Sequence, residues 1–359
     1  MAAPVERSAV RDAVREHVRD PVGEQGRGPD VLGALILGGC AVWPLISAAG
    51  RDGRPEGALL AVLAVTAGYV FGRISGSLVP VATATVVSVG ALVAALVSSH
   101  ALVSSHETFG TAMAVVTPYG DTGAVTALLV LAAGAACCAG TAARRPTVRT
   151  VLRLQALAIA GTASLLGSFV GFIAALGVLL CSLAAARMRR RLLALAGLGL
   201  VTALVVGTSW AVAERALPEG LSVSLEGQLT QYRVALWHDA VELATANPVL
   251  GAGPDRFGDL SPTVSESLDT DGKPHSAPLQ QAAEQGVVGV LLLGGAFGWL
   301  LYGLGRSPCS TPVVLTAGAT LTALAAIASV GNALSFTPVT AGASLLAGLA
   351  TARKAAGPA

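Results

Sequence analysis

Long runs of uncharged and mostly apolar residues alternate along the chain with short clusters of charged residues. An α-helix needs about 20 predominantly apolar residues to cross the hydrocarbon core of a bilayer, and several of these runs reach that length. The pattern therefore predicts a polytopic membrane protein made of transmembrane helices. The uncharged runs are residues 31–50, 57–72, 74–106, 122–143, 154–186, 192–213, 285–305 and 307–352.

The uncharged run 154–186 is longer than a single crossing requires. Strongly basic segments precede it at 144–153 and follow it at 187–191. Because cytoplasmic loops carry an excess of Lys and Arg, both segments are expected in the cytoplasm, and the chain between them must cross the membrane twice. We expect the break between these two helices near residues 167–171.

A second long run, 307–352, is divided in the same way by the segment from Asn332 to Pro338. The expected fold class is therefore all-α, a polytopic bundle of about ten transmembrane helices in the plasma membrane, with both termini in the cytoplasm. The ten expected helices are 31–49, 57–72, 78–97, 121–141, 148–166, 169–186, 191–212, 287–304, 312–329 and 335–351.

Ten crossings divide the chain into five parts. These are a cytoplasmic polar tail at 1–30, transmembrane helices 1 to 7 at 31–212, an extracytoplasmic catalytic loop at 213–286, transmembrane helices 8 to 10 at 287–351, and a cytoplasmic tail at 352–359. The cations of the short loops agree with the positive-inside rule. Most of them then lie on the cytoplasmic side, namely Arg73, Arg306, Arg353 and Lys354, and only Arg51 and Arg54 lie on the outer side. The first tail mixes Arg with Asp and Glu and lacks an apolar centre, so it differs from a signal peptide and is compatible with a short surface helix.

Composition supports the same environment. The chain is 53% hydrophobic and only 12% charged, which excludes an ordinary water-soluble globule. The five cysteines lie in the expected spans or at their edges, so we expect neither a structural disulfide nor a metal cluster. We therefore expect the lipid bilayer to be a partner of the chain, and we expect no nucleic acid.

The long loop contains a segment with helical periodicity at 228–246. Its apolar positions are Leu229, Tyr232, Leu236, Ala240 and Leu243, whereas Gln231, His238, Asp239 and Glu242 lie off this stripe. The spacing predicts a short amphipathic helix that lies on the membrane or on the bundle. Arg233 and Trp237 are four residues apart and share a face, where the indole is placed to stack against the guanidinium.

A turn and a flexible segment follow this helix. Asn247 and Pro248 end it, and the sequence Gly-Ala-Gly-Pro at 251–254 predicts a tight glycine turn. The polar stretch SESLDTDGKP then leads to His275. This histidine is therefore expected at the start of a helix, close to the bilayer surface.

The helix after His275 carries its own polar groups before it enters the membrane. Ser276 is expected to cap it, and Gln280 and Glu284 lie one turn apart on one face. Gly286 and Gly289 then allow the helix to turn or to pack closely.

These residues form three groups in a fixed order. They are Arg233, Trp237 and Ala240; then Pro248, Gly251, Gly253 and Phe257; then His275-Ser276, Leu279-Gln280, Glu284, Gly286 and Gly289. In order, spacing and position before the last spans they resemble the O-antigen ligase and O-antigen polymerase superfamily. The resemblance covers residues 119–350, and its specific part is 233–289. This chain has Phe169 where that family often has Arg, and Ser276 where it usually has Asn.

The resemblance implies a membrane glycan transferase in the synthesis of cell-surface polysaccharide. Members move a glycan from a polyprenyl diphosphate donor to a hydroxyl of an acceptor glycan, lipid or protein. In this chain Arg233 would neutralise the diphosphate, His275 would accept the hydroxyl proton, and Glu284 would orient the imidazole or satisfy the helix start. The implied substrate-binding residues are Arg256, Trp237, Gly251, Gly253, Ser276 and Gln280. No metal and no other cofactor is implied.

Other functions are compatible with the same residues. One alternative is a transporter or flippase for lipid-linked glycans, although transporters usually place ionisable groups at mid-bilayer and repeat their halves. A second alternative is a non-catalytic scaffold of a polysaccharide assembly, which the residues Phe169 and Ser276 suggest. Ligases and polymerases share the motif, so the sequence does not separate these two reactions.

Single residues also have simpler interpretations. Asp269 and Asp271 resemble paired carboxylates that hold a divalent ion, but a hydrophilic turn with Gly272 is the simpler interpretation. Trp237 is more often an anchor at the membrane interface than a platform for a sugar. Arg256 either replaces the missing arginine at 169 or is an exposed loop cation.

Overall fold

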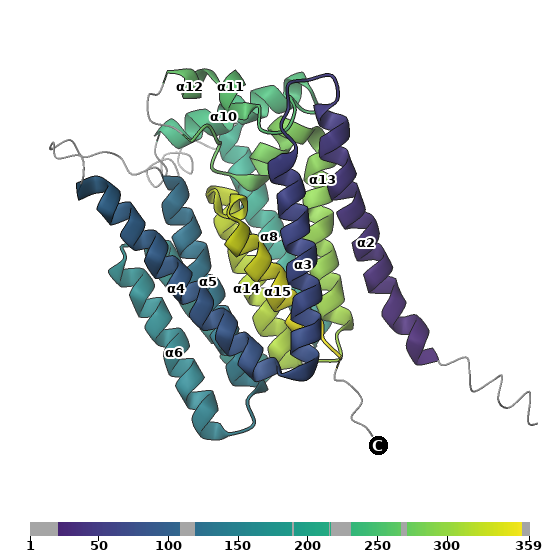
Figure 1. Cartoon of the computed structure of the whole chain (residues 1–359), viewed down its shortest axis with the longest axis vertical. Helices are drawn as coiled ribbons and strands as arrows, with labels where there is room; N and C mark the ends of the chain where they lie inside the picture. The colour runs from purple at the N-terminus through teal and green to yellow at the C-terminus, as the bar shows by residue number, and fades with distance from the viewer. Residues whose placement is uncertain are drawn as a thin grey trace, which may run out of the picture.

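The computed structural model describes residues 21–107, 119–188, 190–214, 216, 231–266 and 271–353. Within these ranges the chain is helical with short connections and without strands, so the expected all-α class is confirmed (Figure 1). The surface helix expected near the N-terminus falls mostly on residues 1–20, which lie outside the described residues. Asp269 and Lys354 lie outside them as well.

Each of the ten expected helices has a counterpart in the described chain. These are α2 (Pro21–Ala48), α3 (Glu56–Leu78), α4 (Pro80–Glu107), α5 (Tyr119–Ala142), α6 (Pro146–Leu165), α7 (Phe169–Ala185), α8 (Arg191–Ala213), α13 (Ala277–Arg306), α14 (Thr311–Val330) and α15 (Thr337–Thr351). Among the described helices, seven are long and apolar enough to cross a membrane: α2, α3, α4, α5, α8, α13 and α14. The chain is a multi-pass membrane protein, and ten as the number of crossings stays a prediction.

The break expected after the fifth helix is present. α6 ends at Leu165 and α7 begins at Phe169. Between them Gly167 has a φ of +75°, a left-handed conformation that glycine adopts without steric cost. The hydroxyl of Ser168 then caps α7 by accepting a hydrogen bond from the backbone N–H of Gly171. The second expected break is also present, as the 3₁₀-helix η1 (Ala333–Ser335) between α14 and α15.

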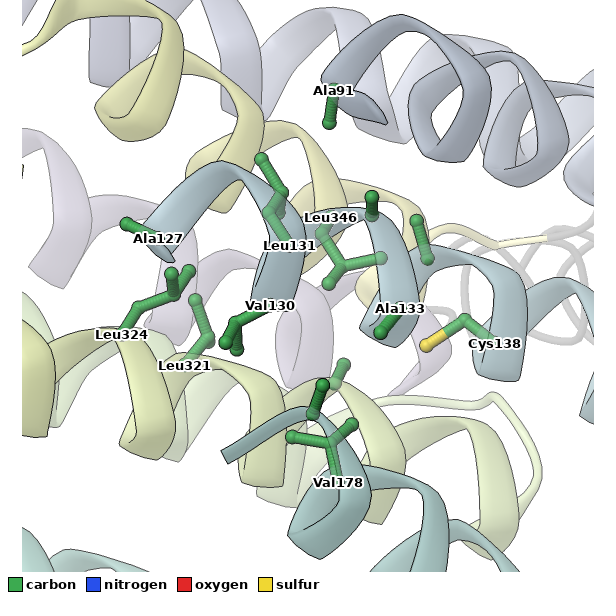
Figure 2. Packing of buried hydrophobic residues seen from close by; sticks show 14 of the residues in the cluster. Ala91, Ala127, Val130, Leu131, Ala133, Cys138, Val178, Leu321, Leu324 and Leu346 are labelled. Atoms are coloured by element: carbon green, nitrogen blue, oxygen red, sulfur yellow. The ribbon is translucent and has the colours of Figure 1, made fainter. Parts of the chain in front are cut away.

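α5 forms the centre of the bundle. It packs against α4, α6, α7, α14 and α15, and nearly all of its residues from Val125 onward are buried. Figure 2 shows the packing around it, with Ala127, Val130, Leu131, Ala133 and Cys138 of α5 among Ala91 of α4, Val178 of α7, Leu321 and Leu324 of α14, and Leu346 of α15. Small Ala residues let these helices approach closely, as in other membrane bundles.

Three short helices gather at one end of the bundle, which we call the loop end (Figure 1). They are α10 (Gln231–Ala246), α11 (Phe257–Leu260) and α12 (Pro262–Ser265). The turn between α2 and α3 lies at the same end, because the backbone N–H of Arg54 donates to the carbonyl of Pro254 at 2.9 Å. These positions are the ones that the expected topology places outside.

The opposite end, which we call the tail end, holds the start of α2 and the end of the described chain (Figure 1). There the indole Nε1 of Trp299 donates to the carbonyl of Pro29 at 2.7 Å. Nη2 of Arg191 donates to the carbonyl of Gly305 at 2.9 Å. The expected topology places Pro29, Arg191 and Gly305 at the cytoplasmic side and Trp299 in the cytoplasmic half of a span, so the arrangement of the helices is compatible with it.

α10 packs on the bundle, mainly against α13 and also against α8 and α12. Leu236 and Ala240 of the expected apolar stripe are fully buried. Asp239, which we expected on the polar face, is also buried. Its carboxylate accepts hydrogen bonds from the hydroxyl of Ser261 at 2.5 Å and from the backbone N–H of Thr263 at 3.1 Å. Two donors offset the cost of burying this charge and fasten α12 to α10.

The close contact of α3 with α15 gives a test of the packing. A Cβ on Gly72 would lie 2.1 Å from the carbonyl oxygen of Leu345, whereas a Cβ on Gly90 of α4 would meet nothing within 4 Å. We expect Gly72→Ala to force the helices apart and to cost about 1–3 kcal/mol of stability. Thermal unfolding of the purified chain in detergent measures this. Gly90→Ala is the matched control and should be neutral or slightly stabilising; equal midpoints for the two variants would contradict the packing.

Candidate active site at the loop end

α13 is broken near its N-terminal end. Gly286 has φ +66° and ψ −164°, far from helical values, so Ala277 to Gln285 forms a separate first segment. A Cβ at this position would lie 2.3 Å from the carbonyl oxygen of Val249, which leaves no room for a side chain. The expectation that Gly286 lets the helix turn is therefore confirmed. Val287 begins the long apolar part of the helix.

Backbone groups at this break are satisfied by the glycine turn. Ala252 N–H donates to Ala283 O at 2.8 Å, Gly253 N–H donates to Glu284 O at 2.9 Å, and Val287 N–H donates to Pro248 O at 2.8 Å. Gly251 and Gly253 have φ values of +66° and +108°. A Cβ on Gly251 would lie 2.3 Å from the carbonyl carbon of Glu284, so this glycine is required for the close approach. The structure gives both glycines a backbone role beside α13.

Two side chains of α2 reach the same break. The indole Nε1 of Trp43 donates to the carbonyl of Gln285 at 2.9 Å. The hydroxyl of Ser47 lies 2.6 Å from the carbonyl of Leu250 and 3.2 Å from that of Glu284. Sequence patterns did not single out either residue. Since unsatisfied backbone groups are costly when buried, these contacts fix the start of α13 to the first helix of the bundle.

Glu284 is buried, and its contacts are on the side of the glycine turn. Its carboxylate accepts hydrogen bonds from Nε2 of Gln280 at 3.2 Å and from the backbone N–H of Asp255. The pair of Gln280 and Glu284 expected from their spacing is thus present. However, the carboxylate in contact with His275 belongs to Asp271. Among the described residues no hydrogen bond or ion pair joins Glu284 to His275, and the role of Glu284 toward the imidazole or the helix start stays a prediction.

His275 lies in the short connection before α13. It has a φ of +51°, which is unusual for a residue with a side chain, and only 7% of it is exposed. Nε2 of the imidazole lies 3.3 Å from Oδ1 of Asp271. Nδ1 is buried and has no hydrogen-bond partner among the described residues. One nitrogen of this ring is thus held by a carboxylate, and the other faces no protein partner.

Arg233 and His275 lie close enough for their charges to interact. Burial is the main cause that lowers the pKa of His275 below its ordinary value of 6.5; the carboxylate of Asp271 opposes this shift, and the positive charges of Arg233 and Lys273 lower the pKa further. Nη1 of Arg233 donates to the carbonyl of Val330 at the end of α14, at 2.8 Å. The structure therefore brings together the two residues that we expected to carry the chemistry.

Ser276 occupies the expected N-cap position of α13, with an extended backbone. Its carbonyl accepts the first helical hydrogen bond, from Gln280 N–H at 2.8 Å. Its hydroxyl, however, makes no capping bond, and Oγ is buried without a partner among the described residues. The expected side-chain cap is thus wrong. Two consecutive residues, His275 and Ser276, thus each carry a buried polar atom that has no hydrogen-bond partner among the described residues.

Trp237 and Arg256 differ in their availability to a substrate. Trp237 is 1% exposed and packs in a cluster with Leu236, Phe257 and Leu279, so its ring is part of the core and is neither an interface anchor nor an open platform. Arg256 keeps 22% of its side chain exposed, with long ion pairs to Asp52 at 3.8 Å and to Asp259 at 3.9 Å.

Asp271 and Asn332 are the site residues that sequence analysis missed. Nδ2 of Asn332 donates to Oδ2 of Asp271 at 3.3 Å, so the loop carboxylate joins His275 to the break between α14 and α15. The sequence pattern presents Asp271 as part of a hydrophilic turn or of a carboxylate pair for a divalent ion, and not as a partner of His275. A sequence signal existed, because Asp271 precedes His275 by four residues and Asn332 is an amide in an otherwise apolar stretch, beside an expected break.

Metal binding has little support in the described part of the chain. No group of three or more His, Cys, Asp or Glu side chains gathers there in a way that could hold an ion. Of the two carboxylates that resembled a metal site, Asp269 lies outside the described residues. The carboxylate of Asp271 is engaged with His275 and Asn332.

Comparison with known protein families supports the resemblance noted in the sequence. A family model described as O-antigen ligase matches residues 150–294. This range includes Arg233, His275, Glu284 and the break at Gly286. Comparison with curated proteins found no match. The family model covers part of the chain and, together with the loop-end residues, supports membership in the O-antigen ligase superfamily.

Proposed function

We propose that this protein transfers a saccharide from a polyprenyl diphosphate to an acceptor hydroxyl, at the outer face of the cell membrane, in the synthesis of a surface polysaccharide. The observation that carries the proposal is that His275 and Arg233 are both connected to the end of α14, because Arg233 donates to the carbonyl of Val330, and Asp271, which contacts His275, accepts a hydrogen bond from Asn332. A base and a planar cation at that position match the two requirements of the reaction, proton removal and diphosphate stabilisation.

The proposed reaction is a displacement at the anomeric carbon of the donor saccharide. The acceptor oxygen forms a bond to this carbon while the bond from the carbon to the phosphate oxygen breaks, and polyprenyl diphosphate leaves with the electron pair. The hydroxyl proton passes to His275, which is neutral at pH 7 because its pKa is lowered. The guanidinium of Arg233 pairs with phosphate oxygens and stabilises the negative charge that grows on the leaving group.

The location of the site suits a lipid-linked donor. The polyprenyl chain of such a donor lies in the bilayer, and its diphosphate lies at headgroup depth. His275 is eleven residues before Gly286, where the apolar part of α13 begins. The positive-inside rule assigns the tail end to the cytoplasm, because Arg73, Arg191 and Arg306 lie there, and the loop end to the outer face.

Other residues of the loop end have supporting roles in the proposal. Glu284, Gln280 and the two glycines at 251 and 253 hold the broken start of α13 in place. Arg256, with its partly exposed guanidinium and long ion pairs, is available as a second cation for the diphosphate. Ser276 follows His275, and its hydroxyl, which has no partner among the described residues, suits a contact with substrate.

The first test replaces the two principal residues in cells that lack the native gene. We expect His275→Ala to lower the amount of surface polymer by about 10²- to 10⁴-fold, the usual contribution of a general base. Arg233→Ala should cause a comparable loss, whereas Arg233→Lys should retain part of the activity because it keeps the charge but not the planar fork. Gel analysis of the polymer, with immunoblots of the membrane protein, measures both effects.

The matched control is His238→Ala, which removes an exposed imidazole from α10. It should leave the polymer at the wild-type level. Unchanged polymer in His275→Ala cells with normal protein levels would refute the proposal. The leaflet that accumulates the donor separates transfer from transport: loss of a transferase leaves lipid-linked saccharide exposed to an impermeant lectin outside, whereas loss of a transporter leaves it inside.

The second test concerns pH. His275 acts in its neutral form, and its pKa in the folded protein is lowered from 6.5. The fraction of neutral imidazole therefore stays high as the pH falls to 6.5 and decreases only at lower pH. With purified protein in nanodiscs and extracted lipid-linked donor, we expect the acid limb of kcat/KM to lie below pH 6.5. An acid limb well above pH 6.5 would contradict His275 as the base in this environment.

A further inference from the structure

We propose that Asp271 is the positioning residue of the site: held by Asn332, it fixes the proton of neutral His275 on Nε2 and so makes Nδ1 the atom that accepts the proton of the acceptor hydroxyl. The inference rests on the proposed function for the role of His275. It adds which nitrogen reacts and which residues determine that choice.

The first step of the argument is the position of the Asp271 carboxylate. Oδ1 lies 3.3 Å from Nε2 of His275 and also accepts the backbone N–H of Lys273 at 3.2 Å. Oδ2 accepts Nδ2 of Asn332 at 3.3 Å. Both oxygens thus have donors, and the carboxylate cannot rotate away from the imidazole without losing hydrogen bonds.

The second step is the orientation of the Asn332 amide. The hydroxyl of Ser335 donates a hydrogen bond to Oδ1 of Asn332. Because that oxygen is occupied, the NH₂ group is the part of the amide that faces Asp271. Asn332 itself is buried at the break between α14 and α15, and Gly123 of α5 lies beside its backbone. The loop carboxylate is therefore fixed to the centre of the bundle.

The third step is the tautomer of the imidazole. An ionised carboxylate only accepts hydrogen bonds, so the nitrogen that faces Asp271 must carry the proton. In neutral His275 this leaves the lone pair on Nδ1. Nδ1 is buried and has no hydrogen-bond partner among the described residues, and the buried hydroxyl of the next residue, Ser276, also has none among them. The reactive nitrogen is thus the one that the protein leaves without a hydrogen bond.

Charges around the ring agree with this assignment. Once Nδ1 has taken a proton, the imidazolium faces the carboxylate of Asp271, which stabilises it. Asp271 raises the pKa of His275, whereas burial, Arg233 and Lys273 lower it. The groups together keep the ring neutral at pH 7 but let it accept a proton during the reaction. Removal of Asp271 or Lys273 should therefore shift the titration of His275 in opposite directions.

Imidazole nitrogen NMR of the full-length chain in nanodiscs, with ¹⁵N-labelled histidine, tests the proposal without any substrate. The chain has five histidines, and the signals that disappear in His275→Gln identify the relevant ring. In the wild-type protein we expect the Nε2–H tautomer at neutral pH. Because the tautomer is measured in the wild-type protein, this result tests the proposal even if Asp271 variants fold poorly.

Asp271→Asn is the principal variant and Lys273→Gln its matched control. Asp271→Asn should reduce the Nε2–H population and move the titration of His275 to lower pH, and it should slow transfer at least about tenfold. Lys273→Gln should move the titration to higher pH and leave the tautomer unchanged, because the backbone of Lys273, not its side chain, bonds Asp271.

Three outcomes overturn the inference. One is an Nδ1–H tautomer in the wild-type protein; another is an Asp271→Asn spectrum with wild-type tautomer and titration; the third is a normal transfer rate for that variant while His275→Ala is inactive. If instead the spectra behave as expected but His275→Ala retains full polymer synthesis, the geometry is right and the proposed function is wrong.

Discussion

The break in α13 at Gly286 is the constraint on which the loop end depends. A helix that enters a membrane must satisfy its backbone groups internally or through the protein, because the bilayer offers no hydrogen bonds. Here the turn from Pro248 to Gly253 pairs with the carbonyls of Ala283 and Glu284, and α2 supplies further donors. The first segment of α13 is therefore rigidly attached to two distant parts of the chain, and His275 lies directly before this segment.

A second constraint is electrostatic. At the loop end the buried carboxylates of Asp239 and Glu284 and the partly exposed carboxylate of Asp271 each accept hydrogen bonds from specific donors. Asp239 is held by Ser261 and Thr263, and Asp271 is held by Asn332 and Lys273. Buried charges without partners would destabilise the fold, so these hydrogen bonds are a condition for keeping ionisable groups near an apolar bundle. The result is a largely neutral imidazole in the field of a cation, which is the arrangement that the proposed transfer from a diphosphate would use.

The bundle below the site is built differently, from small residues and few specific contacts. α5 is surrounded by five helices and carries Ala at many positions, while α3 and α15 meet through glycines. Dispersion and close approach replace the hydrophobic effect as the source of helix association in lipid. Rigid packing of α5 and α14 also supports Asn332, because Gly123 lies against its backbone. The same helices therefore determine both the stability of the bundle and the geometry of the site.

The sequence by itself determined the helical class, the positions of ten helices, both breaks, the glycine turn and the membership of Arg233 and His275 in one motif. The helices, the breaks and the turn follow from apolar run length, arginine position and glycine chemistry, all of which are local or additive along the chain, whereas the motif of Arg233 and His275 follows from its resemblance to a family. Only the tertiary structure decided which carboxylate meets His275, because Glu284, on the helix that follows His275, faces the glycine turn, whereas Asp271 is fixed by Asn332 from 61 residues away. Likewise, burial of Trp237 and Asp239 depends on which neighbours cover α10, and periodicity alone does not specify them.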